Sequence, residues 1–168
     1  MSKIIIFSKK KWSKQNYENL DKKKFIYYKN INYKNIKKIN PKIIFFIHWS
    51  KKIERRIFEN FLCIQFHCSD LPKFRGGSPV QNQILKGLKN TKLTAFKVNN
   101  KLDSGDYCFK KNLSLKGSAS QIYERLEKCA FNIIKILIKK KIHQILQTKR
   151  ITLILQKKTR EKKLYERF

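Results

Sequence analysis

Four short apolar runs set the strongest constraint on what this chain can fold into. Each is rich in β-branched or aromatic residues: KIIIF (3–7), KFIYY (24–28), KIIFFI (42–47) and CIQF (63–66). Three of them are nearly continuous in apolarity, which is typical of strands buried on both faces of a parallel sheet. Between the last two runs, KKIERRIFENF (51–61) has apolar residues at helical spacing, so the sequence predicts a right-handed strand–helix–strand unit.

The second half of the chain continues this alternation. A helix is predicted from Ser78 to about Leu88, because Ser-Pro suits an N-cap followed by the first helical position. Further elements are predicted as follows: strands at 92–98 and 106–115, a long helix over 118–141 capped by Ser118 or Ser120, and a candidate last strand, ITLIL, at 151–155.

This order of elements favours one α/β domain, with a doubly wound, mostly parallel sheet and helices on both faces. The length of 168 residues fits a single hydrophobic core of ordinary size. We expect the domain to cover residues 1–156 and to be followed by a mobile charged tail over 157–168.

The charge of the chain allows two interpretations. Lys and Arg number 41 against 11 Asp and Glu, a formal net charge of +30, and such a field attracts nucleic acid by releasing counterions from the phosphate backbone. The excess is almost all Lys, spread evenly among Ile and Asn, which share A/T-rich codons. Compositional drift of the genome is therefore the favoured reading, and nucleic-acid binding stays the alternative.

Cysteine spacing and hydropathy point to an ordinary reduced, soluble protein. The four cysteines show no C-x-x-C pair, which argues against a zinc site and against a disulfide scaffold, so no metal is expected. No stretch approaches the ~20 apolar residues that a membrane-spanning helix needs. The sequence therefore predicts a cytoplasmic protein that does not insert into membranes.

The segment FHCSDLPKFRGGSPVQNQIL (66–85) holds most of the unusual residues. His67 follows a predicted strand, at the sheet edge where α/β proteins bind ligands. Arg75, Gly76 and Gly77 form a turn that exposes backbone N–H groups and leads into a helix, where an anion or a developing oxyanion can bind.

A second candidate lies in KLDSGD (101–106). Asp103 falls in a loop between two predicted strands and could face His67, and a histidine beside a carboxylate is suited to moving one proton. An ordinary Asp-Ser-Gly turn is the alternative reading. His48 and His143 are interpreted as structural residues.

These motifs together resemble the formyltransferases that use 10-formyltetrahydrofolate. The similarity rests on HCSDLPKFRGGSP followed by LDSGD and on KGSASQIYERL, and it covers about residues 41–126. It implies that His67 and Asp103 are catalytic, that 10-formyltetrahydrofolate is the co-substrate, and that Arg75, Gly76 and Gly77 form the loop on the substrate side. It also implies a folate-binding set: His48, Trp49, Ser50, Lys51, Ser69, Asp70, Leu71, Pro72, Asn99, Asn100, Lys101 and Leu102.

One position departs from the family pattern. The family has an Asn two residues before the histidine, and this chain has Gln65, which keeps the carboxamide but adds a methylene. A shift of ~1 Å in a positioning group can cost ~100-fold in rate. Either the site adjusts around Gln65 as a third catalytic residue, or the activity is weakened.

The wording of the motifs resembles formyltransferase-like proteins of surface-sugar biosynthesis. An amino sugar linked to a nucleotide is therefore the expected acceptor. The alternatives are a methionyl-tRNA or glycinamide-ribonucleotide formyltransferase, and a basic RNA-binding module that has lost turnover.

Overall fold

The computed structural model describes residues 2–139. These residues form six strands: β1 (Ile4–Phe7), β2 (Phe25–Tyr28), β3 (Ile43–Phe46), β4 (Cys63–His67), β5 (Asn90–Lys97) and β6 (Tyr107–Ser114). The same residues form five helices: α1 (Lys11–Glu18), α2 (Tyr33–Ile39), α3 (Arg55–Asn60), α4 (Pro79–Leu85) and α5 (Ala119–Lys139).

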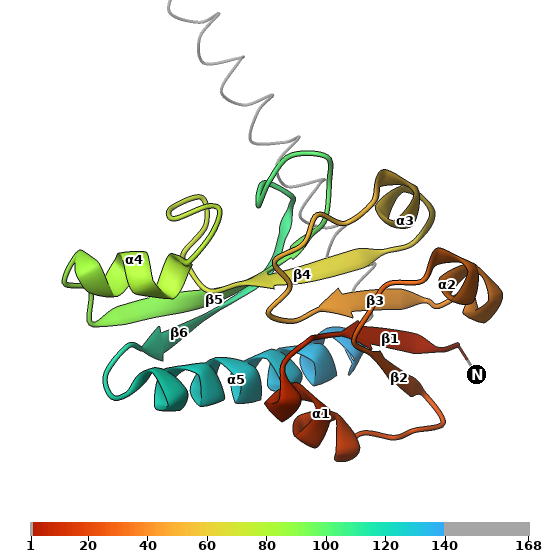
Figure 1. The fold of residues 1–168 in the computed structure, drawn as a ribbon, viewed down its shortest axis with the longest axis horizontal. Helices are drawn as coiled ribbons and strands as arrows, with labels where there is room; N and C mark the ends of the chain where they lie inside the picture. The colour runs from red at the N-terminus through yellow and green to blue at the C-terminus, as the bar shows by residue number, and fades with distance from the viewer. Residues whose placement is uncertain (1, 140–168) are drawn as a thin grey trace, which may run out of the picture. The chain divides into compact units, whose positions relative to one another are not determined.

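The strands make one sheet in the order β2-β1-β3-β4-β5-β6 (Figure 1). Strands β1 to β4 are parallel, and β5 runs antiparallel to both of its neighbours. Because β2 and β3 lie on opposite sides of β1, the direction of winding reverses there, and ligands of such sheets bind at the carboxyl edge near this reversal. The predicted α/β fold with a mostly parallel sheet is confirmed.

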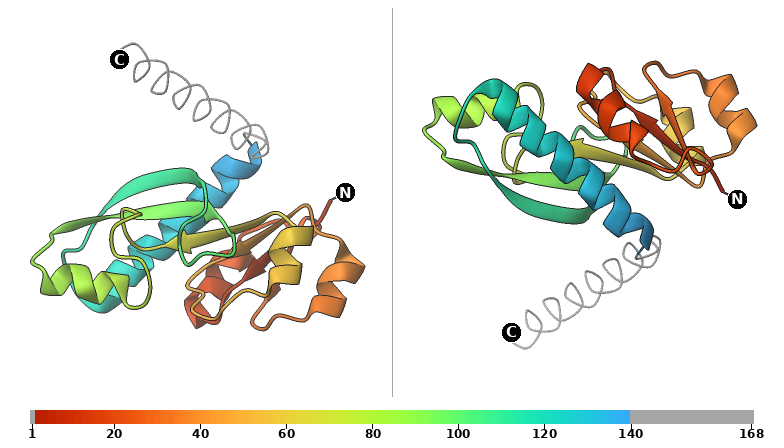
Figure 2. Two further views of the ribbon diagram at one scale, coloured as in Figure 1. Left: turned by 90° about the horizontal axis from the view of Figure 1, so that it is seen from above. Right: turned by 90° about the horizontal axis from the view of Figure 1, so that it is seen from below.

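Helices cover both faces of the sheet (Figure 2), with α2, α3 and α4 over one face and α1 and α5 over the other. On the first face, Phe7 and Phe46 stack at 5.3 Å and pack in one cluster with Ile36 of α2 and Ile57 of α3. On the second face, α5 contributes a buried apolar stripe: Ile122, Leu126, Ala130 and Ile133. Burial on both faces explains why the strand sequences do not alternate.

Neither α1 nor α2 is predicted from the sequence. Both are short and rich in lysine, and α2 buries only Ile36, so the apolar periodicity that identifies a helix is weak. Local capping supports α2, because the side chain of Asn32 accepts a hydrogen bond from the backbone N–H of Asn35 at 3.1 Å.

Two predicted helix ends need correction. Ser78 occupies the N-cap position of α4, but its φ is 51° and its side chain makes no capping hydrogen bond, so Pro79 at the first turn begins the helix. The helix ends at Leu85, before the predicted end near Leu88. For α5, Ser118 is the cap, since it exchanges hydrogen bonds of 2.9 and 3.3 Å with Gln121.

The compact unit that carries the site comprises Met1–Ile134. The candidate strand at 151–155, the domain end at 156, the charged tail and His143 all lie outside the described residues. Within residues 2–139, no helix has the length and apolar character needed to cross a membrane.

Candidate active site

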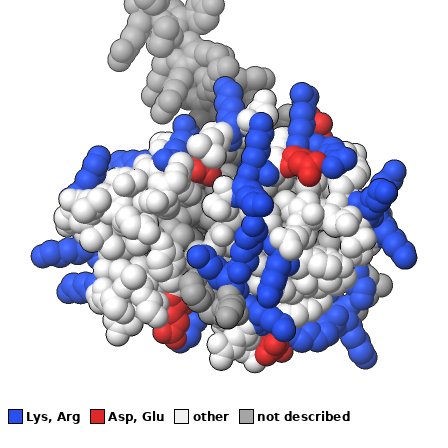
Figure 3. All heavy atoms as spheres, viewed as in Figure 1, with Lys and Arg blue, Asp and Glu red and all other residues white. Residues whose placement is uncertain are grey.

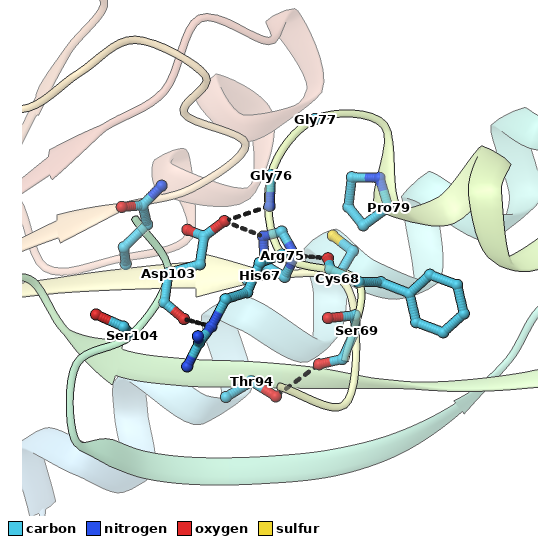
Figure 4. Close-up of polar contacts among 12 residues, drawn as sticks. His67, Cys68, Ser69, Arg75, Gly76, Gly77, Pro79, Thr94, Asp103 and Ser104 are labelled. Carbon is cyan, nitrogen blue, oxygen red and sulfur yellow. Dashed lines mark hydrogen bonds and ion pairs between the residues drawn. The ribbon is translucent and has the colours of Figure 1, made fainter. Parts of the chain in front are cut away.

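The candidate site lies at the carboxyl end of β4, beside the end of β3 and the loop that joins β5 to β6 (Figure 4). Gln65 and His67 are two residues apart on β4, so they share one face of the sheet. Cys63, on that same face, belongs to the cluster packed under α2 and α3. His67 is 6% exposed and pairs across the sheet with Thr94 of β5.

The imidazole of His67 is held between two acceptor oxygens. Its Nε2 lies 2.7 Å from the carbonyl oxygen of Phe74, and because a carbonyl can only accept, this contact assigns a hydrogen to Nε2. Its Nδ1 lies 3.5 Å from Oδ2 of Asp103, which is longer than a normal hydrogen bond. The ring is thus fixed in orientation, with a carboxylate beside its second nitrogen.

A backbone N–H and an arginine side chain of the β4 loop, residues 68–78, fix Asp103 in place. Its Oδ2 accepts a hydrogen bond of 2.9 Å from the backbone N–H of Gly76, and its carbonyl accepts one of 3.0 Å from Nε of Arg75. Asp103 has a φ of 45°, a left-handed conformation that Asp adopts more readily than most residues. The carboxylate therefore comes to His67 already oriented.

Two glycines make this approach of the loops possible. Gly76 has a φ of 88°, where a side chain would be strained. At Gly105, a Cβ atom would lie 1.6 Å from the carbonyl oxygen of Lys97. The loop that carries Asp103 can return to β6 by this path only because residue 105 has no side chain.

The β4 loop is held by polar contacts within itself and with β5 and α4. Ser69 donates from its hydroxyl to the carbonyl of Lys73, and Thr94 donates to the carbonyl of Ser69, both at 2.7 Å. The side chain of Gln83 donates to the carbonyl of Cys68 at 2.8 Å. These bonds satisfy buried backbone carbonyls that the irregular loop would otherwise leave unpaired.

Two lysines hold the carboxylate of Asp70 in the same loop. Lys110 and Lys92 lie 2.7 and 2.9 Å from its oxygens, and Lys110 also donates to the carbonyl of Leu71. Hydrogen bonds from Lys110 and then Lys92 lower the pKa of Asp70 below its ordinary value. Asp70 therefore anchors the loop as a charged group, and Leu71 next to it is fully buried.

Cys68, which follows His67, is not a second reactive group. Burial raises the pKa of its thiol to about 12, and the charge of Glu127 adds to this effect. A thiol is nucleophilic only as a thiolate, so this cysteine is a small buried apolar residue.

Gln65 contacts the end of β3. Its side-chain Nε2 donates to the carbonyl of Trp49 at 3.2 Å. Because Gln is one methylene longer than Asn, the amide of Gln65 reaches the β3 loop, residues 47–54. Among residues 2–139, the contact with Trp49 is the hydrogen bond that the side chain of Gln65 makes.

The structure places the predicted folate-binding segments around this edge. In the β3 loop, His48 and Trp49 are buried or nearly so, and Ser50 and Lys51 are exposed. In the loop before Asp103, the backbone N–H of Lys101 donates to the side chain of Asn99 at 2.9 Å. Four consecutive residues of this loop are exposed: Asn99, Asn100, Lys101 and Leu102. Their assignment to folate, like that of Ser69 to Pro72, stays a prediction.

Sequence reasoning missed three contributors to this site. They are the carbonyl of Phe74, the hydroxyl of Thr94 and the carboxylate of Glu127, which lies 2.7 Å from His48. A backbone carbonyl leaves no trace in a sequence, and a Thr within a strand or a Glu within a helix is ordinary there. Glu at a position inside the apolar stripe of α5 is the one signal that the sequence offered.

A hollow of about 550 Å³ lies next to the β4 loop. Its lining includes Asp70, Phe74, Lys92 and Asn112 but neither His67 nor Asp103. Across residues 2–139, no group of three or more His, Cys, Asp or Glu side chains is arranged to hold a metal ion.

The fold is that of a doubly wound α/β protein with a histidine–aspartate pair at the end of β4, and comparison with known proteins identifies its family. The family model described as "Formyl transferase" matches residues 6–138. The chain belongs to the formyl transferase family, and the resemblance predicted from its motifs is confirmed.

The most informative relatives are methionyl-tRNA formyltransferases. The one from Kosmotoga olearia is 30% identical over 112 residues, which is 66% of this chain and 35% of that protein. The one from Campylobacter hominis is 41% identical over 73 residues, or 44% of this chain and 24% of that protein. The chain thus spans only about a quarter to a third of the length of these curated relatives.

Solved structures of formyltransferases resemble this chain as well. A methionyl-tRNA formyltransferase from Clostridium thermocellum has a TM-score of 0.79 and 41% identity, covering 84% of this chain and 66% of that one. The formyltransferase PseJ from Anoxybacillus kamchatkensis, solved with tetrahydrofolate and a UDP-linked formamido sugar, has a TM-score of 0.64, covering 86% of this chain and 78% of that one. Its identity of 20% shows a shared fold alone.

Proposed function

We propose that this chain carries the site of an N-formyltransferase, which moves a formyl group from 10-formyltetrahydrofolate to an amine. The observation that carries the proposal is the buried pair of His67 and Asp103 at the carboxyl end of β4, 3.5 Å apart. The pair lies within the region that the family model matches. Family membership and an oriented proton carrier support the same reaction.

The residues around the pair fit a folate. Leu102 is 71% exposed and lies beside Gly76, and so large an apolar side chain at a rim is a surface that a flat heterocycle can cover. Backbone groups of the β3 loop stand on the other side of Gln65. Tetrahydrofolate is bound in related structures, PseJ and HypX from Aquifex aeolicus.

The reaction assigns a task to each side chain. When bound, the folate supplies a formyl group whose carbon can be attacked by an amine, so that a C–N bond forms and the bond to the folate nitrogen breaks. His67 carries a proton from the attacking amine to the departing folate nitrogen. If Nε2 is the atom that exchanges this proton, its hydrogen bond to the carbonyl of Phe74 must first break. Asp103 fixes the ring. The amide of Gln65 offers a donor to the formyl oxygen.

Two acceptors compete in this proposal. The wording of the motifs predicts an amino sugar linked to a nucleotide, whereas relatives with 30% and 41% identity are methionyl-tRNA formyltransferases, which makes methionyl-tRNA the second candidate. Figure 3 shows Lys and Arg side chains in a band down the middle of the visible face and along its edges, with a broad area to the left of the band that carries few of them. These side chains lie on several parts of the face rather than in one patch, so they do not outline a single nucleic-acid footprint.

The test is a single-turnover transfer from 10-formyltetrahydrofolate, with a UDP-linked amino sugar and methionyl-tRNA offered in separate reactions. We expect formylation of one acceptor, and His67→Ala should abolish it while tetrahydrofolate still binds. Equal turnover by His67→Ala would remove His67 from the reaction. Salt-sensitive RNA binding with no affinity for tetrahydrofolate would show instead the binding module that has lost turnover.

A further inference from the structure

A buried carboxylate on α5 has no task in the proposed reaction. Glu127 is 1% exposed, and its Oε2 lies 2.7 Å from Nε2 of His48. Within residues 2–139, no donor meets hydrogen-bond geometry with either of its oxygens, so the ion-pair contact with His48 is the polar contact observed for this carboxylate. Burying a carboxylate costs several kcal/mol unless a partner compensates it, so this single contact with His48 calls for an explanation.

The surroundings of Glu127 locate it beneath the carboxyl edge of the sheet. Its charge raises the pKa of Cys68 after the larger effect of burial, and it also contributes to raising the pKa of Tyr27, again mainly raised by burial. Cys68 follows β4 and Tyr27 lies in β2. Glu127 contacts His48 of the β3 loop from α5, which covers the face of the sheet opposite to α2 and α3 and therefore opposite to His67 and Gln65.

His48 links this carboxylate to the β3 loop through a strained backbone. Its φ is 48°. This conformation costs a non-glycine residue about 1 kcal/mol or more and persists only where surrounding contacts hold it. The imidazole contacts α5, at 2.7 Å from Glu127 and edge-on to Tyr123 at 5.8 Å between ring centroids. The contact with Glu127 therefore joins the strained segment to α5 and is one of the interactions that stabilise His48 in this conformation.

The next residue is anchored on the other face of the sheet. Trp49 packs against Phe7 and Phe46, with ring centroids 5.9 and 5.7 Å apart. Consecutive side chains that point to opposite faces fix the peptide between them. The carbonyl of Trp49, which belongs to the fixed segment, accepts the hydrogen bond from Gln65.

We propose that Glu127 is a positioning residue, which through His48 holds the β3 loop and the amide of Gln65 in the geometry that folate binding needs. The inference rests on the proposed function and deepens it, because it assigns part of the folate site to a helix on the far face of the sheet. It also explains why Gln is tolerated at residue 65: the loop that receives the longer amide is itself tied down.

Glu127→Met removes the contact at similar volume and leaves no buried charge on α5. We expect the KM for 10-formyltetrahydrofolate and the Kd for tetrahydrofolate to rise about 10-fold, while kcat falls less. Glu127→Gln keeps an acceptor for His48 and should stay within about 3-fold of the parent. Glu124→Met is the matched control, since Glu124 lies one turn earlier on α5, is largely exposed and pairs with Lys128; it should leave KM unchanged.

His48→Asn gives an independent variant, because Asn tolerates the left-handed conformation. It should show the same rise in KM, and the double variant with Glu127→Met should be no worse than either single one. A merely structural role would lower Tm and leave the KM of the folded protein unchanged. If the parent binds tetrahydrofolate and both variants bind it equally well, the positioning role is wrong while the proposed function stands. A parent that binds none overturns the proposed function itself.

Discussion

The β4 loop and the β3 loop leave neighbouring strands at the same edge of the sheet, yet they are held in different ways. In the β4 loop, the ties are several short polar contacts to β5, β6 and the loop of Asp103. In the β3 loop, the contacts to other elements include one buried pair, His48 with Glu127, the packing of Trp49 and one side-chain hydrogen bond from Gln65.

This difference in contacts determines which of the two loops can be recognised from the sequence. The β4 loop needs Ser, Asp, Pro and Gly at fixed positions, because each one satisfies a backbone group or permits a turn, and this produces a recognisable motif. The β3 loop depends on a glutamate on α5, far along the chain. We expect the β4 loop to withstand the loss of single contacts better than the β3 loop does.

The largest effect should come from Gly105→Ala, which changes the loop between β5 and β6. This loop carries Asp103, which contacts the β4 loop. A Cβ atom there would lie 1.6 Å from the carbonyl of Lys97, a backbone atom that cannot move aside without breaking the pairing of β5. We expect the free energy of unfolding to fall by about 4 kcal/mol or more, measured by urea denaturation. Gly77→Ala is the control, since nothing lies within 4 Å of its Cβ position. Equal stability of the two variants would refute this account.

Asp103→Asn should separate the two tasks of this residue. Asn suits a φ of 45° and its side-chain oxygen can still accept from Gly76, so the β4 loop and tetrahydrofolate affinity should persist. Loss of the charge beside His67 should slow single-turnover transfer ~100-fold, or about 3 kcal/mol of barrier. Asp103→Ala should also loosen the loop and weaken folate binding. Parental turnover by Asp103→Asn would mean that the carboxylate charge has no role.

Gln65→Ala tests the link between β4 and the β3 loop. The variant loses both the contact with Trp49 and the donor near His67, and we expect turnover to fall about 30-fold, near 2 kcal/mol of barrier. Gln65→Asn is too short to span the observed contact but restores the usual family residue, and it should fall between Ala and the parent. An Ala variant as fast as the parent would remove Gln65 from the site.

Asp70→Asn should have the smallest effect, because its two lysine partners are partly exposed. The hydrogen bonds from Lys110 and Lys92 lower the pKa of Asp70, so its contribution is present above its unfolded-state pKa and disappears as pH falls through the lower folded-state value. The expected loss is under about 1 kcal/mol at pH 7.

Urea unfolding of the parent and Asp70→Asn across pH 2–7 measures this contribution. The two curves should converge at the acidic end, whereas Asp106→Asn, which changes an exposed carboxylate, should track the parent throughout. A constant difference between the parent and Asp70→Asn at every pH would rule out ionisation of Asp70 as the cause.

The sequence by itself determined the strands β1 to β4, the start of α5 to within Ser118 or Ser120, and the position of His67 at a strand end. These features depend on signals that act over a few residues, namely continuous apolar runs, a capping pair and turn-forming residues. The family motif belongs to the same kind, because its residues serve local turns in the β4 loop.

The tertiary structure alone decided which groups meet. Strand order places the end of β3 beside β4, and the antiparallel course of β5 returns the chain so that Asp103 comes within 3.5 Å of His67 and 2.9 Å of the N–H of Gly76. The contact of His48 with Glu127 arises in the same way. Such pairings join segments that are distant in the chain, and buried polar groups take whichever partner the packed sheet and helices bring to them.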